Sequence, residues 1–380
     1  MARFLALTSR GLGEVLKNEI SSLGLKVLKG SQTRVSFESN WKNLYRANLC
    51  LRSCTRIIMP ILDFNAYNGD DLYNNCKKHD FTKYIRPDQT LKVEVSLSGN
   101  GPFNNSIFVA QRIKDVVVDQ FNNKFGKRPS VDLEAPDLYL VARVRGSEVS
   151  LAVDTSGVSL AHRGYRLDQG MAPLREHLAA GLLLRTGWTG EGLLYDPMCG
   201  SGTFLIEAEL IRQRVSPGIS RHNFAFQKMI NFDSGAFDQV VEELMGLERE
   251  TEGSVSTFGS DQDPRAISAS QANIERAGMS DSIGLKQISL HDCQPLGGAS
   301  SKGLIVVNPP YGERLSNSRD LEELYRLLGN QLKAHFRGWE AWILSGNPDL
   351  TSFLGMKSEK SYTVFNGNLE CRWLKYAIRD

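Results

Sequence analysis

Asp196-Pro197-Met198-Cys199-Gly200-Ser201-Gly202-Thr203 stands between a short apolar run, 193–195, and an apolar stretch with helical spacing, 203–213. Glycines at a strand-to-helix turn let the backbone approach a ligand closely and leave free N–H groups at the helix start. The spacing matches neither a dinucleotide fingerprint nor a P-loop, because no Lys follows the last Gly. The turn therefore predicts a mononucleotide-like ligand that carries a carboxylate rather than a diphosphate. A tight turn without function is the alternative.

The chain around this turn repeats a strand–turn–helix pattern from about residue 166 onward. The runs 303–307 and 341–344 are apolar without alternation, which is typical of parallel strands buried on both faces. The expected strands are 193–195, 256–260, 285–289, 304–307 and 341–344, and the expected helices are 173–184, 203–213, 264–277 and 321–336. A closing antiparallel hairpin is expected over 361–364 and 370–378. These features predict an α/β fold with a mostly parallel sheet.

The first half of the chain has a different pattern, in which helices alternate with antiparallel hairpins. Strands are expected at 4–8 and 91–97, and hairpins at 26–37 and 138–153. Helices are expected at 11–23, 41–57 and 107–125. Cys50 and Cys54 would be neighbours on the second of these helices, as reduced packing residues. The pattern predicts an α+β region.

Two acidic motifs follow the next two expected strands. In Gly259-Ser260-Asp261-Gln262-Asp263-Pro264, a carboxylate at the end of a strand can accept both ribose hydroxyls, as in dinucleotide folds. We assign this role to Asp261, with Gln262 beside it, and expect Asp263 to cap the following helix. In His291-Asp292-Cys293, the carboxylate of Asp292 could accept from an adenine amine, and Cys293 lies next to it. A simple turn is the alternative for this second motif.

Asn308-Pro309-Pro310-Tyr311-Gly312 comes directly after the buried strand that ends at residue 307. The two prolines fix the backbone and lack competing N–H groups. The side-chain oxygen of Asn308 and the carbonyl of Pro309 can therefore grip a planar NH2 group. Tyr311 offers a ring on which a base can stack. Catalysis at such a site would come from positioning and electrostatics, with no strongly shifted general base required.

The four motifs fall on successive strand ends, which form the ligand-binding edge of open α/β sheets. In this order they resemble the Rossmann-like S-adenosylmethionine-dependent amino-methyltransferases. The junction His162–Arg166 and the helix-like stretch 173–180 extend the resemblance over the whole chain, to the THUMP-containing RlmL-type 23S rRNA guanine-N2 methyltransferases. The family often has Lys-Glu-Thr where this chain has Arg175-Glu176-His177.

The resemblance implies three parts: a ferredoxin-like subdomain at 1–60, a THUMP RNA-binding domain at 61–160, and a class I methyltransferase domain with a seven-stranded sheet at 161–380. It implies S-adenosylmethionine as the cofactor and guanine as the base held by Asn308, Pro309 and Tyr311. The residues expected to shape the cofactor pocket are Asp196, Pro197, Cys199, Gly200, Gly202, Thr203, Asp261, Gln262, Asp292, Cys293 and Asn308, and the expected catalytic residues are Asn308, Pro309, Pro310 and Tyr311.

The net charge of +2 conceals an asymmetry: residues 1–165 hold 23 basic against 16 acidic side chains, and residues 166–380 hold 22 against 27. A basic first half fits a polyanionic partner, and the THUMP resemblance makes RNA, most of all 23S rRNA, that partner. The expected RNA-binding residues are Lys114, Lys124, Lys127, Arg128, Arg143 and Arg145. No sequence window approaches the length of a membrane-spanning helix, and neither Cys nor His has metal-site spacing. We therefore expect a cytoplasmic enzyme without a metal.

Other activities remain open on the sequence. The Asn-Pro-Pro-Tyr motif also serves adenine-N6 methyltransferases of DNA, and THUMP methyltransferases also modify tRNA. An alternative from a different functional class is a non-catalytic RNA-binding protein that takes part in ribosome assembly. The oligomeric state, the modified nucleotide and the role of the insertion at 216–252 are not indicated by the sequence.

Overall fold

The computed structural model describes residues 1–166, 174–249, 255–295, 302–310 and 318–379, which form two separate sheets. The eight-stranded sheet has the order β2-β3-β1-β4-β8-β7-β5-β6, and the seven-stranded sheet has the order β11-β10-β9-β12-β13-β15-β14. The first sheet comprises β1 Ala2–Thr8, β2 Lys26–Gly30, β3 Arg34–Ser39, β4 Cys54–Asn65, β5 Thr90–Ser98, β6 Ser130–Val131, β7 Leu138–Arg145 and β8 Glu148–Asp154. Its helices are α1 Gly13–Ser22, α2 Trp41–Cys50, α3 Gly69–Cys76 and α4 Ser106–Phe125.

The second sheet comprises β9 Leu193–Asp196, β10 Thr257–Asp261, β11 Ile283–Gln287, β12 Gly303–Val307, β13 Glu340–Ser345, β14 Lys360–Asn366 and β15 Leu369–Ala377. Its helices are α5 Glu176–Thr186, α6 Thr203–Arg212, α7 Ser234–Met245, α8 Pro264–Arg276, α9 Ser318–His335 and α10 Pro348–Thr351. Strands β9 to β13 run parallel, and the β14–β15 hairpin joins β13 in antiparallel fashion. This confirms the predicted fold class: a mostly parallel seven-stranded sheet preceded by an α+β region.

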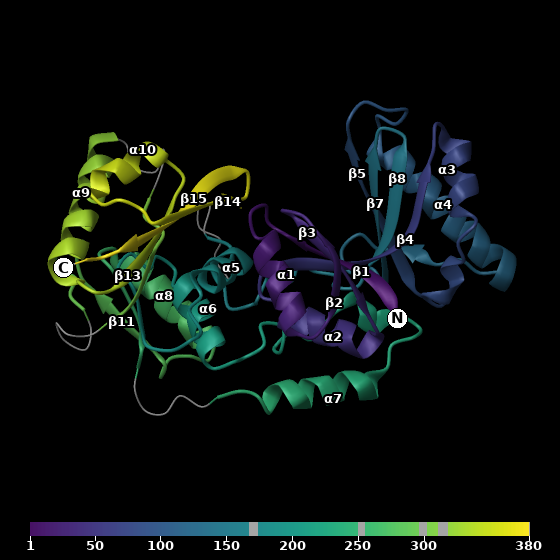
Figure 1. Cartoon of the computed structure of the whole chain (residues 1–380). Coiled ribbons are helices and arrows are strands. Elements are labelled where there is room, and N and C mark those ends of the chain that lie inside the picture. The colour runs from purple at the N-terminus through teal and green to yellow at the C-terminus, as the bar shows by residue number, and fades with distance from the viewer. Residues whose placement is uncertain (167–173, 250–254, 296–301, 311–317, 380) are drawn as a thin grey trace.

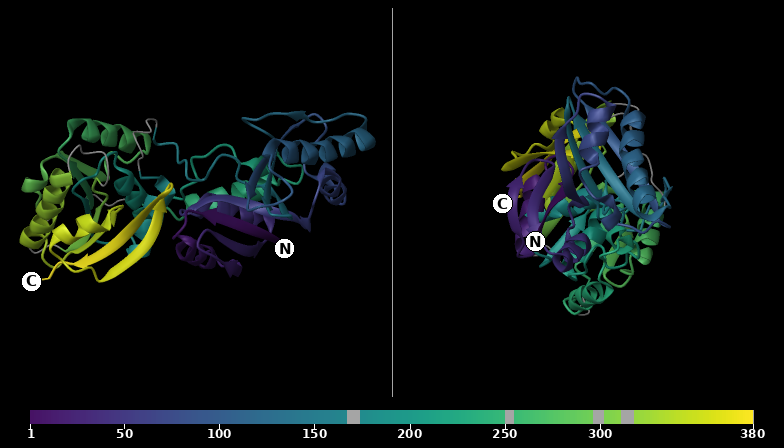
Figure 2. Two further views of the ribbon diagram at one scale, coloured as in Figure 1. Left: turned by 90° about the horizontal axis from the view of Figure 1, so that it is seen from above. Right: turned by 90° about the vertical axis from the view of Figure 1, so that its right-hand side faces the viewer.

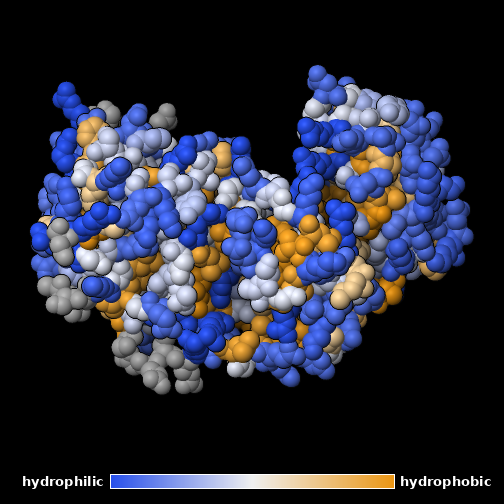
Figure 3. Space-filling model, viewed as in Figure 1, coloured by the Kyte–Doolittle hydropathy of each residue, from blue (hydrophilic) through white to orange (hydrophobic). Residues whose placement is uncertain are grey.

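The molecule is arranged as a row (Figures 1 and 2). The seven-stranded sheet lies at one end, β1–β3 with α1 and α2 lie in the middle, and β5, β7 and β8 with α3 and α4 lie at the far end. Helices α5 and α6 pack on one face of the seven-stranded sheet and α9 on the other, which buries its central strands on both sides. The space-filling view shows a hollow between the two ends of the row (Figure 3).

The prediction of a helix over residues 41–57 is wrong beyond residue 50, where α2 ends. The side chain of Asn40 caps the start of α2, and the helix ends at Cys50. The backbone N–H groups of Arg52 and Ser53 then donate to the carboxylate of Glu19, at 2.6 and 3.1 Å. The β-branched residues that follow and Pro60 favour a strand and exclude a helix. Cys54 therefore begins β4 and is not a helical neighbour of Cys50.

Strand β4 passes through residue 60 and pairs with both β1 and β8. The middle and far parts of the row thus share one continuous sheet, because this strand belongs to both of them. The predicted domain boundaries, which place a ferredoxin-like subdomain at 1–60 and a THUMP domain at 61–160, stay a prediction.

The insertion after α6 crosses to the middle part and covers α2 (Figure 1). Its aromatic residues Phe226, Phe232 and Phe237 pack on the ring of Tyr45, with ring centroids 4.7 to 5.9 Å apart. Glu243 on α7 forms ion pairs with two basic side chains of α2. The insertion therefore ties the N-terminal region to the seven-stranded sheet.

Candidate active site

The glycine-rich turn between β9 and α6 is held in place by hydrogen bonds from its neighbours. Gly200 and Gly202 both have positive φ, 54° and 78°, a conformation that favours glycine. From α8, Ser270 Oγ donates to the carbonyl of Gly200 at 2.7 Å, and Asn273 Nδ2 donates to the carbonyl of Ser201 at 2.9 Å. A Cβ on Gly200 would meet no atom of the described residues within 4 Å. The turn is fixed by these two hydrogen bonds from α8, and at Gly200 it leaves space where a ligand can approach its backbone.

Burial disfavours the charged forms of Asp196 and Cys199 at this turn. Asp196 is 2% exposed, and burial raises the pKa of its carboxyl group well above the usual value. Its Oδ1 accepts from the N–H of Met198 at 3.0 Å. Burial also raises the pKa of the Cys199 thiol, whose sulfur lies 3.8 Å from Ser270 Oγ. Cys199 is therefore a packing residue and not a nucleophile.

The two predicted residues at the neighbouring strand ends lie at the same sheet edge. Asp196 of β9 pairs with Gly259 of β10, so Asp261 extends two residues past that pair. Its carboxylate accepts from the Gly200 N–H at 3.0 Å and from the Asp263 N–H at 3.0 Å. On the other side of β9, Asn308 follows β12. Since adjacent strands lie about 4.8 Å apart, the ends of β10 and β12 are about 10 Å apart across β9.

The side-chain oxygen Oδ1 of Asn308 is buried and has no hydrogen-bond partner among the residues that the structure describes. A buried amide oxygen without a partner costs about 1–3 kcal/mol. Pro309 beside it is buried and Pro310 is half-buried, and neither has a backbone N–H to donate. Tyr311 lies outside the described residues. The Asn308 oxygen is thus an acceptor in need of a donor.

The predicted adenine side has one exposed carboxylate and one buried thiol. Asp292 ends a short 3-10 helix, Leu290–Asp292, and is exposed. Cys293 is 1% exposed, and its sulfur accepts from the Tyr195 hydroxyl at 3.2 Å. Gln262 is exposed between Asp261 and Asp263, and Asp263 caps α8 as expected, accepting from the Arg265 N–H at 2.9 Å. These positions leave the roles of Gln262, Asp292 and Cys293 as predictions.

The structure adds Arg166, which the sequence reasoning did not single out. Its guanidinium reaches the glycine-rich turn, where one terminal nitrogen bonds Ser201 Oγ at 3.3 Å and Thr203 Oγ1. The other terminal nitrogen donates to the Leu174 carbonyl at 3.1 Å. Its only signal in the sequence was its place in the junction His162–Arg166, many residues before the turn.

The six residues predicted to bind RNA do not share one surface. Arg143 and Arg145 alternate along β7 with buried residues of the face that α4 covers, so they project from the opposite face. Lys124, Lys127 and Arg128 lie at or just after the end of α4 and are exposed. Lys114 is half-buried and pairs with Asp115 at 3.0 Å. The role of this set stays a prediction, and the structure divides it in two.

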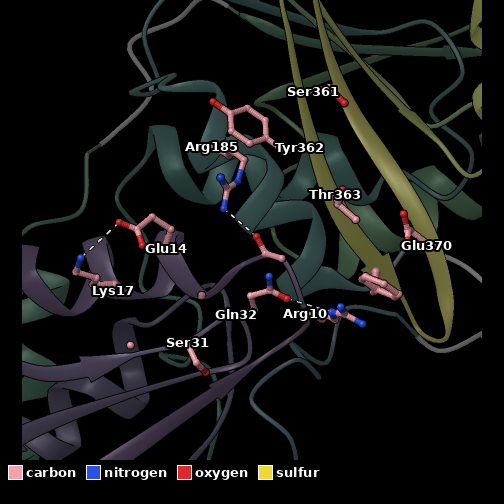
Figure 4. Close-up of a pocket in the computed structure, with 14 residues that line it drawn as sticks. Arg10, Glu14, Lys17, Ser31, Gln32, Arg185, Ser361, Tyr362, Thr363 and Glu370 are labelled. Carbon is pink, nitrogen blue, oxygen red and sulfur yellow. Dashed lines mark hydrogen bonds and ion pairs between the residues drawn. The ribbon is translucent and has the colours of Figure 1, made fainter.

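The N-terminal region meets the part of the chain that carries the seven-stranded sheet, which we call the methyl-transfer half, beside a cavity of about 800 Å³ (Figure 4). Arg10 and Gln32 line it from one side, and Arg185 and Tyr362 from the other. The Arg185 guanidinium donates to the Gly11 carbonyl at 2.8 Å and lies 4.6 Å from the centroid of the Tyr362 ring. These contacts hold the loop before α1 against the hairpin β14–β15.

A parallel sheet with a glycine-rich first turn, an acidic second strand end and an Asn-Pro-Pro motif after the fourth defines a class I methyltransferase that uses S-adenosylmethionine. Three family models match the chain: the RlmL ferredoxin-like domain at residues 3–58, the THUMP domain at 66–154, and the RMKL-like methyltransferase domain at 163–375. The last covers more than half of the chain, which therefore belongs to the RMKL-like methyltransferase family. The expected methyltransferase activity, cofactor and THUMP region are confirmed.

The names of individual relatives are consistent with membership of this family. A Synechocystis protein provisionally named RNA methyltransferase slr0064 is 37% identical over 99% of this chain and 96% of its own. The ribosomal RNA large subunit methyltransferase K/L of Syntrophotalea carbinolica is 37% identical over 100% of this chain, and the match spans 54% of that protein. This chain thus spans about half the length of the K/L relatives.

Solved structures of similar proteins share the whole fold. SMU.472, provisionally titled a methyltransferase and solved with S-adenosylhomocysteine, superimposes with a TM-score of 0.91 at 26% identity, over 100% of this chain and 98% of its own. A Listeria monocytogenes protein described as a predicted N6-adenine-specific DNA methylase gives 0.88 at 28% identity, over 99% and 96%. Within the described residues, no helix is long and apolar enough to cross a membrane, and no cluster of three metal-ligating side chains occurs.

Proposed function

We propose that this enzyme transfers a methyl group from S-adenosylmethionine to the exocyclic N2 amine of a guanine in large-subunit (23S) ribosomal RNA. The observation that carries the proposal is the buried Oδ1 of Asn308, which has no hydrogen-bond partner among the described residues. It lies at the edge of the sheet formed by the carboxyl ends of β9, β10 and β12, which we call the catalytic edge. An exocyclic amine is a donor that would satisfy it. The K/L relatives, named for ribosomal RNA, favour that substrate. A cytoplasmic location goes with this proposal.

The chain's own residues fit the cofactor and the amine. The open space at Gly200 and the free N–H groups at the start of α6 suit the amino-acid part of the cofactor, and Asp261 suits its ribose. S-adenosylmethionine, when bound, supplies an electrophilic methyl group. The oxygens of Asn308 and Pro309 would accept the two amine hydrogens and orient the nitrogen lone pair. The rate would come from this positioning and from the fixed dipoles around the nitrogen.

A basic surface at the far end of the row supports an RNA substrate. We call it the basic end; its residues are Lys77, Lys78, Lys83, Lys124, Lys127 and Arg128. Gln120 on α4 holds the end of α3 by donating to the carbonyls of Lys77 and His79, at 3.3 and 2.7 Å. Lys124 donates to Thr82 Oγ1 at 2.7 Å and lies 3.9 Å from the carboxylate of Asp80. Such a surface attracts phosphates without reading sequence.

The test is nucleoside mass spectrometry on 23S rRNA, 16S rRNA, tRNA and DNA, each incubated with the enzyme and labelled S-adenosylmethionine. We expect label as N2-methylguanosine in 23S rRNA, and its loss by at least about a hundredfold in Asn308→Ala. Asn347→Ser is the matched control, because Asn347 follows the neighbouring strand β13 and its capping bond to the Asp349 N–H survives in Ser.

The other outcomes each correct a different part of the proposal. Label in tRNA would overturn the ribosomal substrate. Label as N6-methyladenine would overturn the guanine target, an outcome that the name of the Listeria relative makes worth measuring. Equal activity of Asn308→Ala and Asn347→Ser would overturn the role of the amide oxygen.

A further inference from the structure

Arg166 places a cation beside the glycine-rich turn, yet it has no carboxylate partner among the residues that the structure describes. All of its described hydrogen bonds are to neutral oxygens: the hydroxyls of Ser201 and Thr203 and the carbonyl of Leu174. Its Nε is buried and has no acceptor among the described residues. Because a guanidinium is always charged and has five N–H donors, this charge remains available to an anion.

The neighbouring arginine of the junction shows the contrast. The side chain of Arg163, three residues earlier, is 3% exposed and pairs with the fully buried Glu207, at 3.4 Å from Nε to Oε1. The same carboxylate oxygen accepts from the Tyr165 hydroxyl at 3.1 Å. The Glu207 carboxylate is therefore already paired with Arg163. Arg166 extends instead toward the start of α6.

The start of α6 also favours an anion. The residue before the helix, Gly202, is left-handed and has no side chain to cap it. The first N–H groups of a helix without such a cap carry a partial positive charge. The hydroxyls of Ser201 and Thr203 accept from Arg166 and lie 3.4 Å from each other, so at least one of the two still has a hydrogen to donate to a ligand. Arg166, two hydroxyls and the helix start thus meet at one place.

We propose that Arg166 binds the carboxylate of the amino-acid part of S-adenosylmethionine, together with the start of α6. Arg166 is a cofactor-positioning residue: it fixes the amino-acid end and so fixes the reactive methyl group relative to Asn308. A planar guanidinium suits a carboxylate better than an ammonium group does, because it can donate two parallel hydrogen bonds; for Arg166 such a pair requires Nη2 to exchange one of its two hydroxyl acceptors for a carboxylate oxygen. The inference depends on the cofactor alone and not on which nucleic acid is methylated.

The competing explanation is that Arg166 only ties the Leu174 carbonyl to the turn. Calorimetric titration with two ligands separates the two roles. S-adenosylhomocysteine carries the carboxylate, and 5′-methylthioadenosine has the same nucleoside without the amino-acid part. In Arg166→Gln, we expect the Kd of S-adenosylhomocysteine to rise by about tenfold to a hundredfold, as for a lost charge-assisted hydrogen bond. The Kd of 5′-methylthioadenosine should change by less than about twofold.

Two further variants make the result specific. Arg166→Lys keeps the charge without the planar fork and should give an intermediate loss. Arg372→Gln, on the closing hairpin, removes an arginine that bonds Thr363 and Glu370 and should bind both ligands as the wild type does. An equal loss of affinity for both ligands in Arg166→Gln would show that Arg166 only holds the Leu174 carbonyl to the turn, and it would overturn the proposal. Unchanged affinity for both ligands would overturn the proposal as well.

If Arg166→Gln does not fold, the ligand can be changed instead of the protein. The methyl ester of S-adenosylhomocysteine lacks the negative charge, so wild type should bind it about tenfold to a hundredfold more weakly than the acid. In Arg166→Lys, esterification of the ligand should raise the Kd by a smaller factor than in wild type, because the planar guanidinium that pairs with the carboxylate is already missing. An equal cost in both proteins would overturn the assignment.

Discussion

At the scale of single residues, His177 shows how the N-terminal region affects the methyl-transfer half. It occupies the position where the resembling family often has Thr. The ring is fully buried, and its Nε2 lies 2.7 Å from Ser9 Oγ of the N-terminal region. Its Nδ1 is buried without a partner among the described residues. The residue thus joins two distant parts of the chain, a role that a sequence motif alone could not reveal.

This burial predicts a pH dependence of stability. Burial lowers the pKa of His177 from 6.5 to about 3, so the folded protein keeps the ring neutral while the unfolded chain takes up a proton below pH 6.5. Stability is therefore lost as the pH falls from 6.5 toward 3. At pH 5 the loss from this group amounts to about 2 kcal/mol.

The measurement is urea unfolding of wild type and His177→Gln at several pH values. The difference between the two profiles cancels the carboxylates that titrate in both proteins. We expect the free energy of unfolding of the variant to fall less than that of wild type between pH 6.5 and pH 5. Parallel profiles would show that His177 titrates alike in the folded and unfolded chains.

At the scale of elements, the sequence predicted the parallel sheet well because four of its strands are each followed by a polar motif and the runs 303–307 and 341–344 lack alternation. It failed where tertiary contacts decide. The end of α2 depends on the Glu19 carboxylate, which is distant in sequence, and no local pattern announces that bond. For the same reason the packing of the insertion on α2 was not predicted. The strand order alone also predicts that the four motifs share one edge of the sheet; their described residues lie after β9, β10, β11 and β12, and their roles stay predictions.

The aromatic insertion gives the prediction that belongs to this scale. Phe226 is fully buried and lies 4.7 Å from the ring of Tyr45 and 5.0 Å from that of Phe224. Its replacement by Ala removes a large core side chain, so Phe226→Ala should lower the free energy of unfolding by about 3–5 kcal/mol.

Urea unfolding followed by tryptophan fluorescence can detect this loss, because Trp41 lies 6.4 Å from Tyr45. Ile230→Ala is the control, since Ile230 belongs to the same insertion but is 50% exposed. It should change stability by less than about 1 kcal/mol. Similar losses in the two variants would mean that the insertion is not part of the core.

At the scale of the whole molecule, the charge asymmetry of the sequence becomes a spatial separation. The catalytic edge lies at one end of the row, and the basic end lies beyond α3 and α4 at the other (Figure 1). The continuous eight-stranded sheet and the insertion connect the two ends. An RNA that reaches both must be long or folded, which favours ribosomal RNA over a short oligonucleotide. Phosphate contacts at the basic end would then add affinity without touching the chemistry.

This separation predicts that the basic end affects binding and not turnover. Changing Lys78, Lys127 and Arg128 to Gln removes up to three phosphate contacts, so the slope of log K against log salt should become shallower by about 2–3. The KM for 23S rRNA should rise, and kcat at saturating RNA should stay unchanged. The control changes Lys302, Lys357 and Lys360 to Gln; these are exposed lysines of the methyltransferase end, near the starts of β12 and β14 and away from the catalytic edge. A salt slope equal to that of the control triple would show that RNA does not contact the basic end, and an unchanged KM would show that such contacts add no affinity.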